Sequence, residues 1–239
     1  MIKRQAKIDD LRESPAYTIA EAAHYLSVPA ATIRYWSVGR GEYEPLITVP
    51  KQSPTLLSFL NLTELHILAA IRRKHVVAMP KIRRAIEYLN ENVLDVSDRL
   101  HPLISFKLET DGLDLFIEQY GQLINISQGG QTAMRTLISA ALTRIARDPQ
   151  GIPIKLYPFT RPVKLHPVTR DTIQDVPSMV VIDPALAAGR PVIAGTGLAI
   201  QVIAERWSAG ESVKELAYDY ARTEAEIEEA LRCERGMAA

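Results

Sequence analysis

Hydrophobic residues recur every three to four positions over much of the chain, which is the period of an amphipathic α-helix. This pattern predicts helices within residues 17–92, at about 131–147 and beyond residue 200. The side chains expected inside are Ile19, Ala23, Leu26, Ile33, Trp36, Leu65, Leu68, Ala69, Ile82, Ile86, Leu89, Ala133, Leu137, Ile138, Ala141, Leu142, Ile145, Ile200, Ile203, Ala204 and Trp207.

The middle of the chain changes period. In residues 103–127, stretches such as LISFKLE alternate apolar and polar positions, which is typical of a half-buried strand. Asp111-Gly112 and Tyr120-Gly121 supply turn signals between the stretches. This region is therefore predicted to form a three-stranded antiparallel meander.

Five prolines in residues 152–178 argue against long helices or central strands there, because proline fixes φ and removes a backbone donor. After them, MVVID and PVI can pair as two short strands before the last three helices. The fold class predicted is α+β, mainly α. The divisions expected are a winged helix-turn-helix domain at 1–98, a meander and helix at 99–158, a linker at 159–178 and a C-terminal domain at 179–239.

The segment YTIAEAAHYLSVPAATIRYW carries a helix-turn-helix pattern. Thr18 and Glu21 form a capping box that starts the first helix, Ser27-Val28-Pro29 turns the chain, and a second helix begins near Ala30. In such a unit the start of the second helix meets DNA base edges, and GEYEPLITVPKQSPTLLSF can follow as a small β-wing. The residues expected to bind DNA are Ala30, Ala31, Thr32, Arg34, Tyr35, Arg40 and Lys51.

The motifs TIAEAA, TIRYW and LTELHILAAIRRKHVVAMPKIRRAIEYLNEN make residues 17–92 resemble the winged helix-turn-helix domain of the MerR family. The resemblance implies that Thr32, Arg34 and Tyr35 grip the DNA backbone. Residues 1–92 hold 13 Lys/Arg against 9 Asp/Glu, so their net charge is about +4, which supports DNA binding weakly. The alternative is that Arg34 and the Arg72–Lys74 cluster are ordinary solvated residues.

The stretch GRPVIAGTGLAI could suggest a phosphate-binding loop, but a dinucleotide fingerprint needs a third glycine that is absent here. Gly189 is instead expected to take a positive φ in the turn between the strands, and Gly210 to end the next helix. Ser212 with Glu215 and Thr223 with Glu226 are two further capping boxes. The last two helices are therefore predicted to form a second helix-turn-helix-like unit.

Charge distinguishes this second unit. Residues 201–239 hold 5 Lys/Arg and 9 Asp/Glu, a net charge of about −4, and four glutamates lie on the last helix at positions 224, 226, 228 and 229. A phosphate backbone would be repelled by that face, whereas a basic protein partner would not.

Residues 182–232 resemble a family first catalogued as a domain of unknown function, many of whose members are antitoxins of VapB type. The pattern Gly-Arg-Pro-x-Ile-x-Gly-Thr, followed by x-Gly-x-Ser and two capped helices, is present, although members usually carry arginine at the position of Gly197. With the MerR-like unit and the predicted meander, nearly the whole chain resembles the longer mycobacterial antitoxins. The resemblance implies a PIN-like ribonuclease toxin as partner, with a Mg²⁺-holding acidic cluster, and binding to operator DNA.

An antitoxin can block such a nuclease by covering its cleft or by offering a cation to its carboxylates. Arg190 is the candidate cation, although it can equally pair with Asp183 or cap a helix end. The residues expected to bind the toxin are Arg190, Thr196, Trp207, Tyr218 and Tyr220, with core packing as the alternative for Trp207. Because operators are usually palindromic, a homodimer is also expected, with the middle segment as its contact.

Composition narrows the remaining function classes. The formal net charge is zero, 47% of residues are hydrophobic, and the single cysteine, Cys233, forbids an internal disulfide. The five histidines lack metal-ligand spacing and no nucleophile motif occurs, so neither an enzyme nor a cofactor is expected. No signal peptide or membrane-spanning run is found, which predicts a cytoplasmic protein. The alternative function is a stand-alone transcription regulator without a toxin.

Overall fold

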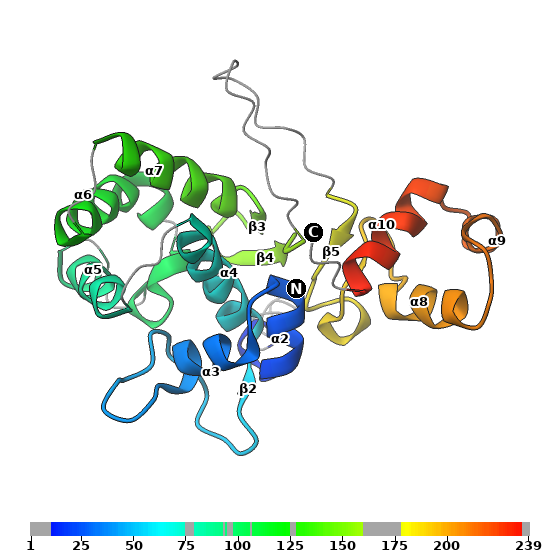
Figure 1. The fold of residues 1–239 in the computed structure, drawn as a ribbon, viewed down its shortest axis with the longest axis horizontal. Helices are drawn as coiled ribbons and strands as arrows, with labels where there is room; N and C mark the ends of the chain where they lie inside the picture. The colour runs from blue at the N-terminus through cyan, green and yellow to red at the C-terminus, as the bar shows by residue number, and fades with distance from the viewer. Residues whose placement is uncertain are drawn as a thin grey trace. The chain divides into compact units, whose positions relative to one another are not determined.

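The computed structural model describes residues 11–74, 79–92, 94, 98–105, 107–124, 128–159 and 178–235 (Figure 1). The fold is mainly helical with small antiparallel sheets, as the sequence predicts. The chain forms two compact units, residues 1–154 and residues 155–239. Among the described residues, no helix has both the length and the apolar character needed to cross a membrane.

The first unit opens with the predicted helix-turn-helix. After β1 (Tyr17–Thr18), helix α2 (Ile19–Leu26) begins with the expected capping box: the Glu21 amide donates to Thr18 Oγ1 over 3.1 Å, and the Thr18 amide donates to Glu21 Oε2 over 2.8 Å. Ser27 turns the chain in the left-handed region with φ 52°, and α3 (Ala30–Val38) follows. Ile19, Leu26, Ile33 and Trp36 are buried as predicted.

The predicted β-wing does not form as a sheet of its own. Between α3 and residue 55 the backbone pairs only at an isolated bridge between Arg40 and Tyr43. The next strand, β2 (Leu56–Leu57), pairs antiparallel with β1 instead, in the register Tyr17 with Leu57. The segment between is a loop held down by the buried side chains of Leu46 and Ile47.

Helix α4 (Phe59–Lys74) is the centre of this unit (Figure 1). It begins at Phe59 because Ser58 and Asn61 cap it reciprocally: the amide of each donates to the side chain of the other over 3.1 Å. Every residue from 61 to 70 is buried, including the polar Asn61, Glu64 and His66. Helix α4 therefore packs on all sides, unlike a surface helix with one apolar stripe.

Helix α5 (Met79–Asn92) carries Pro80 in its first turn and buries Ile82, Ile86 and Leu89, as predicted. Two short 3₁₀ turns, η1 (Asp98–Leu100) and η2 (Pro102–Ile104), then carry the chain back against α4.

The predicted meander at 103–127 is wrong. Its described part is helical: a π-turn, η3 (Leu108–Gly112), leads into α6 (Leu113–Ile124). Leu113, Phe116 and Ile117 are buried at helical spacing, and this longer-range packing overrides the local alternation. Gly121 is a packing residue here, since a Cβ atom on it would stand 2.6 Å from the Gln131 side chain.

Helix α7 (Gln128–Leu142) is shorter at its end than the predicted 131–147 helix. Met134, Ile138, Ala141 and Leu142 are buried, but Ala133 is exposed. Ile145 belongs to β3 (Ile145–Arg147), which pairs with β4 (Pro153–Leu156) across the turn at Asp148-Pro149-Gln150-Gly151.

The second unit contains the predicted hairpin, with β5 (Val180–Val181) antiparallel to β6 (Val192–Ile193), and Leu156 bridges to Ile182 beside it. The turn η4 (Ala187–Gly189) joins the strands, and Gly189 has the expected positive φ of 78°. The predicted linker at 159–178 lies, except for its end residues, outside the described part of the chain.

Three helices complete this unit: α8 (Ile200–Ser208), α9 (Val213–Asp219) and α10 (Glu224–Glu234). Both predicted capping boxes are present, at the starts of α9 and α10. Helix α8 ends before Gly210, which has φ 107°. The core that joins the helices to the hairpin is apolar and consists of Val180, Ile193, Ile200, Ile203, Leu216, Ala217, Ile227, Ala230, Leu231 and Cys233.

Candidate nucleic-acid and protein interfaces

The outer face of α3 is open at its start. Ala30, Ala31 and Arg34 are exposed, and Tyr35 is half-buried with its ring edge-on to Tyr43 at 6.4 Å between centroids. The N-cap residue, Pro29, makes no side-chain cap bond, and the first turn of α3 has no acidic residue. Orphan backbone amides and a positive helix-dipole end at such a start favour an anion.

Thr32 does not face outward with these residues. Its side chain is only 9% exposed, and its hydroxyl accepts a hydrogen bond from Arg72 Nη1 of α4 over 3.0 Å. A hydroxyl engaged in this way is a poor candidate for the predicted DNA contact.

Arg72 of α4 is a further candidate residue, and the local sequence pattern does not single it out. Its guanidinium carbon lies 5.9 Å from the centre of the buried Trp36 ring, so it contacts α3 at two points. In the sequence, Arg72 is a cationic residue that follows a largely apolar helical stretch. Its two partners, Trp36 and Thr32, lie 36 and 40 positions away, so a local pattern cannot reveal them.

The loop after α3 is fixed from both sides. The Leu46 amide donates to the Trp36 carbonyl over 2.8 Å, and Arg83 of α5 donates to the Glu44 carbonyl. Arg40 and Lys51 of this loop are exposed, as a DNA-facing role requires. Arg34, Arg40 and Lys51 thus remain candidates for phosphate contacts, whereas Ala30 and Ala31 offer mainly backbone.

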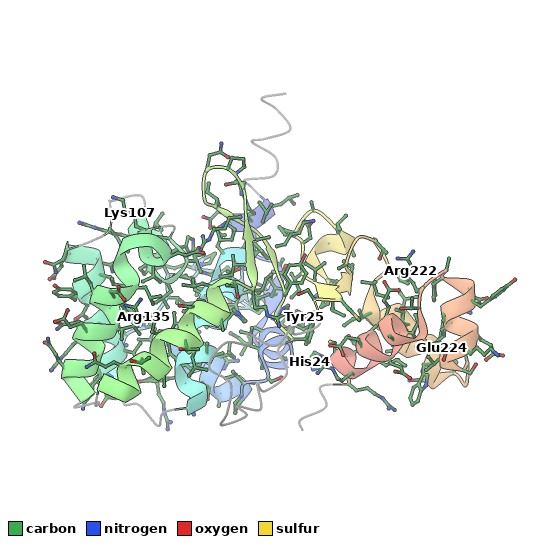
Figure 2. The ribbon with its side chains drawn as sticks, turned by 90° about the horizontal axis from the view of Figure 1, so that it is seen from above. His24, Tyr25, Lys107, Arg135, Arg222 and Glu224 are labelled. Atoms are coloured by element: carbon green, nitrogen blue, oxygen red, sulfur yellow. The ribbon has the colours of Figure 1, made fainter. Side chains whose placement is uncertain are left out.

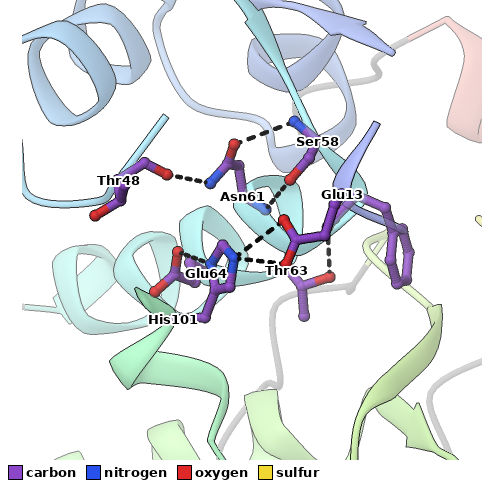
Figure 3. A network of polar contacts seen from close by, with 8 residues as sticks. Glu13, Thr48, Ser58, Asn61, Thr63, Glu64 and His101 are labelled. Atoms are coloured by element: carbon purple, nitrogen blue, oxygen red, sulfur yellow. Dashed lines mark hydrogen bonds and ion pairs between the residues drawn. The ribbon is translucent and has the colours of Figure 1, made fainter. Parts of the chain in front are cut away.

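A polar network joins the N-terminal segment, α4 and His101 in the first unit (Figure 3). His101 Nδ1 lies 2.9 Å from Glu64 Oε2 on α4, and its Nε2 lies 3.3 Å from a carboxylate oxygen of Glu13 in the segment that precedes β1. Nearby, Arg12 is buried and paired with Asp148 over 2.9 Å. The N-terminal segment is therefore tied to parts of the chain that are distant in sequence.

Electrostatics keep His101 charged. Burial disfavours the imidazolium, but hydrogen bonds to Glu13 and Glu64 outweigh it and raise the pKa of His101 from 6.5 to about 9. Burial raises the pKa of Glu64, whereas the hydrogen bond from His101 lowers the pKa of Glu13. At neutral pH the imidazolium is thus the counter-ion of a fully buried carboxyl group.

The second unit repeats the helix-turn-helix plan with α9 and α10 (Figure 2). Ala221 makes the turn at φ 50°, and Glu224 and Glu228 are exposed on α10. Tyr218 of α9 is 87% exposed, which is unusual for a tyrosine in a folded domain. An exposed aromatic ring near carboxylates suits a protein partner better than it suits a phosphate backbone.

The other two aromatic candidates are partly covered by arginines. Arg206 lies over the Tyr220 ring at 5.0 Å and also pairs with Glu211 and Asp219. Those carboxylate hydrogen bonds raise the pKa of Arg206. Arg235 lies over the Trp207 ring at 3.8 Å. Both rings pack against the apolar core, so their role in the fold is clearer than any role in docking.

The last two candidates lie on the hairpin. The Thr196 hydroxyl donates to the Ile193 carbonyl over 2.8 Å and accepts from the Leu198 amide over 3.1 Å, which shapes the turn before α8. Arg190 is half-buried, and the ion pair described for Asp183 is with Lys155 at 3.6 Å. Within the part of the chain that the structure describes, no group of acidic, histidine or cysteine residues could hold a metal ion.

Comparison with known families agrees with this division. Residues 15–86 match the family described as "Putative DNA-binding HTH domain", and residues 180–232 match "Protein of unknown function (DUF433)". These matches confirm the predicted helix-turn-helix and the predicted C-terminal family. The MerR-like character of the first domain stays a prediction.

A curated sequence and a solved structure, both from Mycobacterium tuberculosis, match along nearly the whole chain. The protein named "Putative antitoxin VapB45" of Mycobacterium tuberculosis (strain ATCC 25618 / H37Rv) is 30% identical over 244 residues, which are 91% of this chain and 92% of that protein. A crystal structure titled as Rv2018 from Mycobacterium tuberculosis superposes with a TM-score of 0.66 at 25% identity and covers 91% of this chain and 98% of that chain.

Proposed function

Because this chain belongs to the family of the mycobacterial protein named VapB45, we propose that it is the antitoxin of a type II toxin–antitoxin module. In this proposal the first unit binds operator DNA and represses the operon, and the second unit binds and neutralises a PIN-like ribonuclease. The observation that carries the proposal is the full-length match to an antitoxin-like relative, together with two helix-turn-helix units of opposite charge.

The DNA-binding half rests on the exposed start of α3 and on the cations around it. Arg34, Arg40 and Lys51 are exposed, and no carboxylate lies in the first turn of α3 to repel a phosphate. Each cation that contacts a phosphate releases counterions, so binding should weaken steeply with salt. A homodimer would place two such helices on a palindromic operator.

The test is an electrophoretic mobility shift of the full chain on its own promoter at several salt concentrations. We expect a salt-sensitive shift that Arg34→Ala weakens about tenfold, since a charged contact to phosphate is worth about 1.5 kcal/mol. The absence of a shift at low salt would refute this half of the proposal.

The toxin-binding half rests on the outer face of α9 and α10. A ribonuclease must bind RNA through a cationic surface. The exposed Tyr218 of α9 offers this surface an aromatic anchor, and the exposed Glu224 and Glu228 of α10 offer it carboxylates. Of the residues predicted from the sequence, Tyr218 is thus the strongest contact candidate. Arg190, Thr196, Trp207 and Tyr220 remain candidates with structural roles of their own.

The corresponding experiment expresses the neighbouring nuclease-like gene in a host with and without the full chain. Growth should be rescued by the wild-type chain and by Arg34→Ala, but less by Tyr218→Ala combined with Glu224→Lys and Glu228→Lys. If no toxic neighbour is found, or if the wild-type chain fails to rescue growth, the chain is better interpreted as a stand-alone DNA-binding regulator.

A further inference from the structure

We propose that Arg72 of α4 sets the orientation of α3 on DNA and itself contacts the DNA backbone. This inference rests on the proposed DNA binding and assigns a residue outside the helix-turn-helix segment to it.

The contacts of Arg72 join the two helices. On α3, Thr32 and Trp36 lie one turn apart, and Arg72 contacts both: it donates to Thr32 Oγ1 over 3.0 Å and lies 5.9 Å from the centre of the Trp36 ring. Two contacts one turn apart on the same helix fix both its roll and its depth. Neither Thr32 nor Trp36 is free to move, because both are buried.

The base from which Arg72 reaches is rigid. Residues 61–70 of α4, just before it, are buried on all sides, and Ile71 is buried beside it. A side chain projected from such a helix carries little backbone motion. Helix α3 is thus held in its orientation by α4, at the centre of the first unit, as well as by its neighbour α2.

Arg72 also keeps binding capacity for DNA. A guanidinium has five N–H donors in a planar fork, and the hydrogen bond described for Arg72 uses one of them, while the residue is exposed. The Arg72 guanidinium lies next to Thr32, which belongs to the first turn of α3, and this turn holds no acidic residue that could pair with it. A phosphate oxygen at the start of α3 can accept from the remaining donors.

The distinction between arginine and lysine provides the test. Lysine would keep the charge but lose the planar fork that donates to Thr32 and lies 5.9 Å from the centre of the Trp36 ring. We would measure promoter binding by the full chain against salt for Arg72→Met, Arg72→Lys and Thr32→Val. The matched control is Arg135→Met, which removes one exposed arginine from α7 of the same unit (Figure 2).

We expect Arg72→Met to weaken binding about thirtyfold and to reduce the magnitude of the salt slope by about one, because one phosphate contact is lost along with the fixed helix. Arg72→Lys should keep the slope and lose about tenfold, and Thr32→Val should lose about threefold. Arg135→Met should change affinity by less than about twofold. Thermal melts of each variant identify a temperature at which all the variants are folded. Promoter binding is compared at that temperature.

The inference is overturned if Arg72→Met and Arg135→Met weaken binding equally, or if Arg72→Lys binds as the wild type does. An unchanged salt slope for Arg72→Met would show that Arg72 makes no contact with the DNA backbone. If the wild-type chain itself does not bind the promoter, the proposed DNA binding fails first, so the two failures are distinguishable.

Discussion

The two helix-turn-helix units share a backbone plan and differ at the start of the second helix. Both first helices begin with a capping box, at Thr18 and at Ser212, and both turns use a residue other than glycine in the left-handed region, Ser27 and Ala221. The second helices begin differently. Pro29 leaves the start of α3 without a side-chain cap, whereas Thr223 and Glu226 close the start of α10.

The different starts of α3 and α10 suit different partners, although the two units have the same backbone plan. The start of α3 has no side-chain cap and no carboxylate in its first turn, so the positive end of the helix dipole can receive an anion. The start of α10 already holds a side-chain cap from Thr223 and adds negative charge with Glu224 and Glu226. A fold-level resemblance would assign both units to DNA, and only the residues at the helix start distinguish them.

The units also differ in what supports them. The first unit depends on a polar network in which His101 joins Glu64 to Glu13, whereas the second is held by an apolar core with ion pairs at its surface. Breaking a buried charge pair lowers the free energy of unfolding far more than breaking an exposed pair does.

The largest expected effect is therefore confined to the first unit. His101→Gln should destabilise it by about 3 kcal/mol, because Glu64 is left as a buried carboxyl group without its counter-ion. Urea unfolding followed by Trp36 fluorescence in a Trp207→Phe background would measure this. A loss of under about 1 kcal/mol would contradict the assigned role of His101.

The next effect is the pH dependence of the same unit. Since the folded state raises the pKa of His101 from 6.5 to about 9, the stabilisation is complete below pH 6.5 and is lost as the pH rises through 9. The urea midpoint of the first unit should fall between pH 7 and pH 10. His101→Gln should flatten this dependence, and an equally steep decline in that variant would assign it to other groups.

A smaller effect tests the difference between the helix starts directly. Pro29→Asp should place a carboxylate cap on α3, as Thr223 and Glu226 do on α10, and lower promoter affinity about tenfold by repelling phosphate. Stability should change by less than about 1 kcal/mol, because the gained cap offsets the lost proline rigidity. Pro29→Asn, a neutral cap, is the control and should retain more affinity.

The smallest effect tests what the two units share. Ser27→Gly and Ala221→Gly should each stabilise their unit by about 0.5 kcal/mol, because glycine relieves the left-handed strain at a cost in chain entropy. Thermal unfolding of the two single variants would measure the gains. Destabilisation by either change would mean that its side chain makes a contact that outweighs the strain.

Local features of this fold could be predicted from the sequence. The three capping boxes, the buried faces of α2, α3 and α5, and the hairpin before α8 follow from patterns within a few residues. The meander predicted at 103–127 is wrong because Gly112 and Gly121 lie within helical turns and not between strands. The Gln131 side chain of α7 lies against Gly121, which no local pattern reveals.

The candidate sites show the same limit. The exposed Arg34 and Tyr218 follow from helix position alone, but the contact of Arg72 with Thr32 joins residues 40 apart. The pairing of His101 with Glu64 spans 37 positions, and a histidine outside any motif gave no sign of it. Such partners can be identified only when the packing of α4 is known.

The pairing of Arg12 with Asp148, 136 positions apart, has a consequence for synthesis on the ribosome. Translation proceeds at roughly 5–20 residues per second, so the helix-turn-helix emerges several seconds before the residues that fasten its N-terminal segment. Until Asp148 leaves the exit tunnel, the nascent first unit lacks this buried ion pair. The second unit emerges after the first, so a partner that binds it would act on a chain whose first unit has already been synthesised.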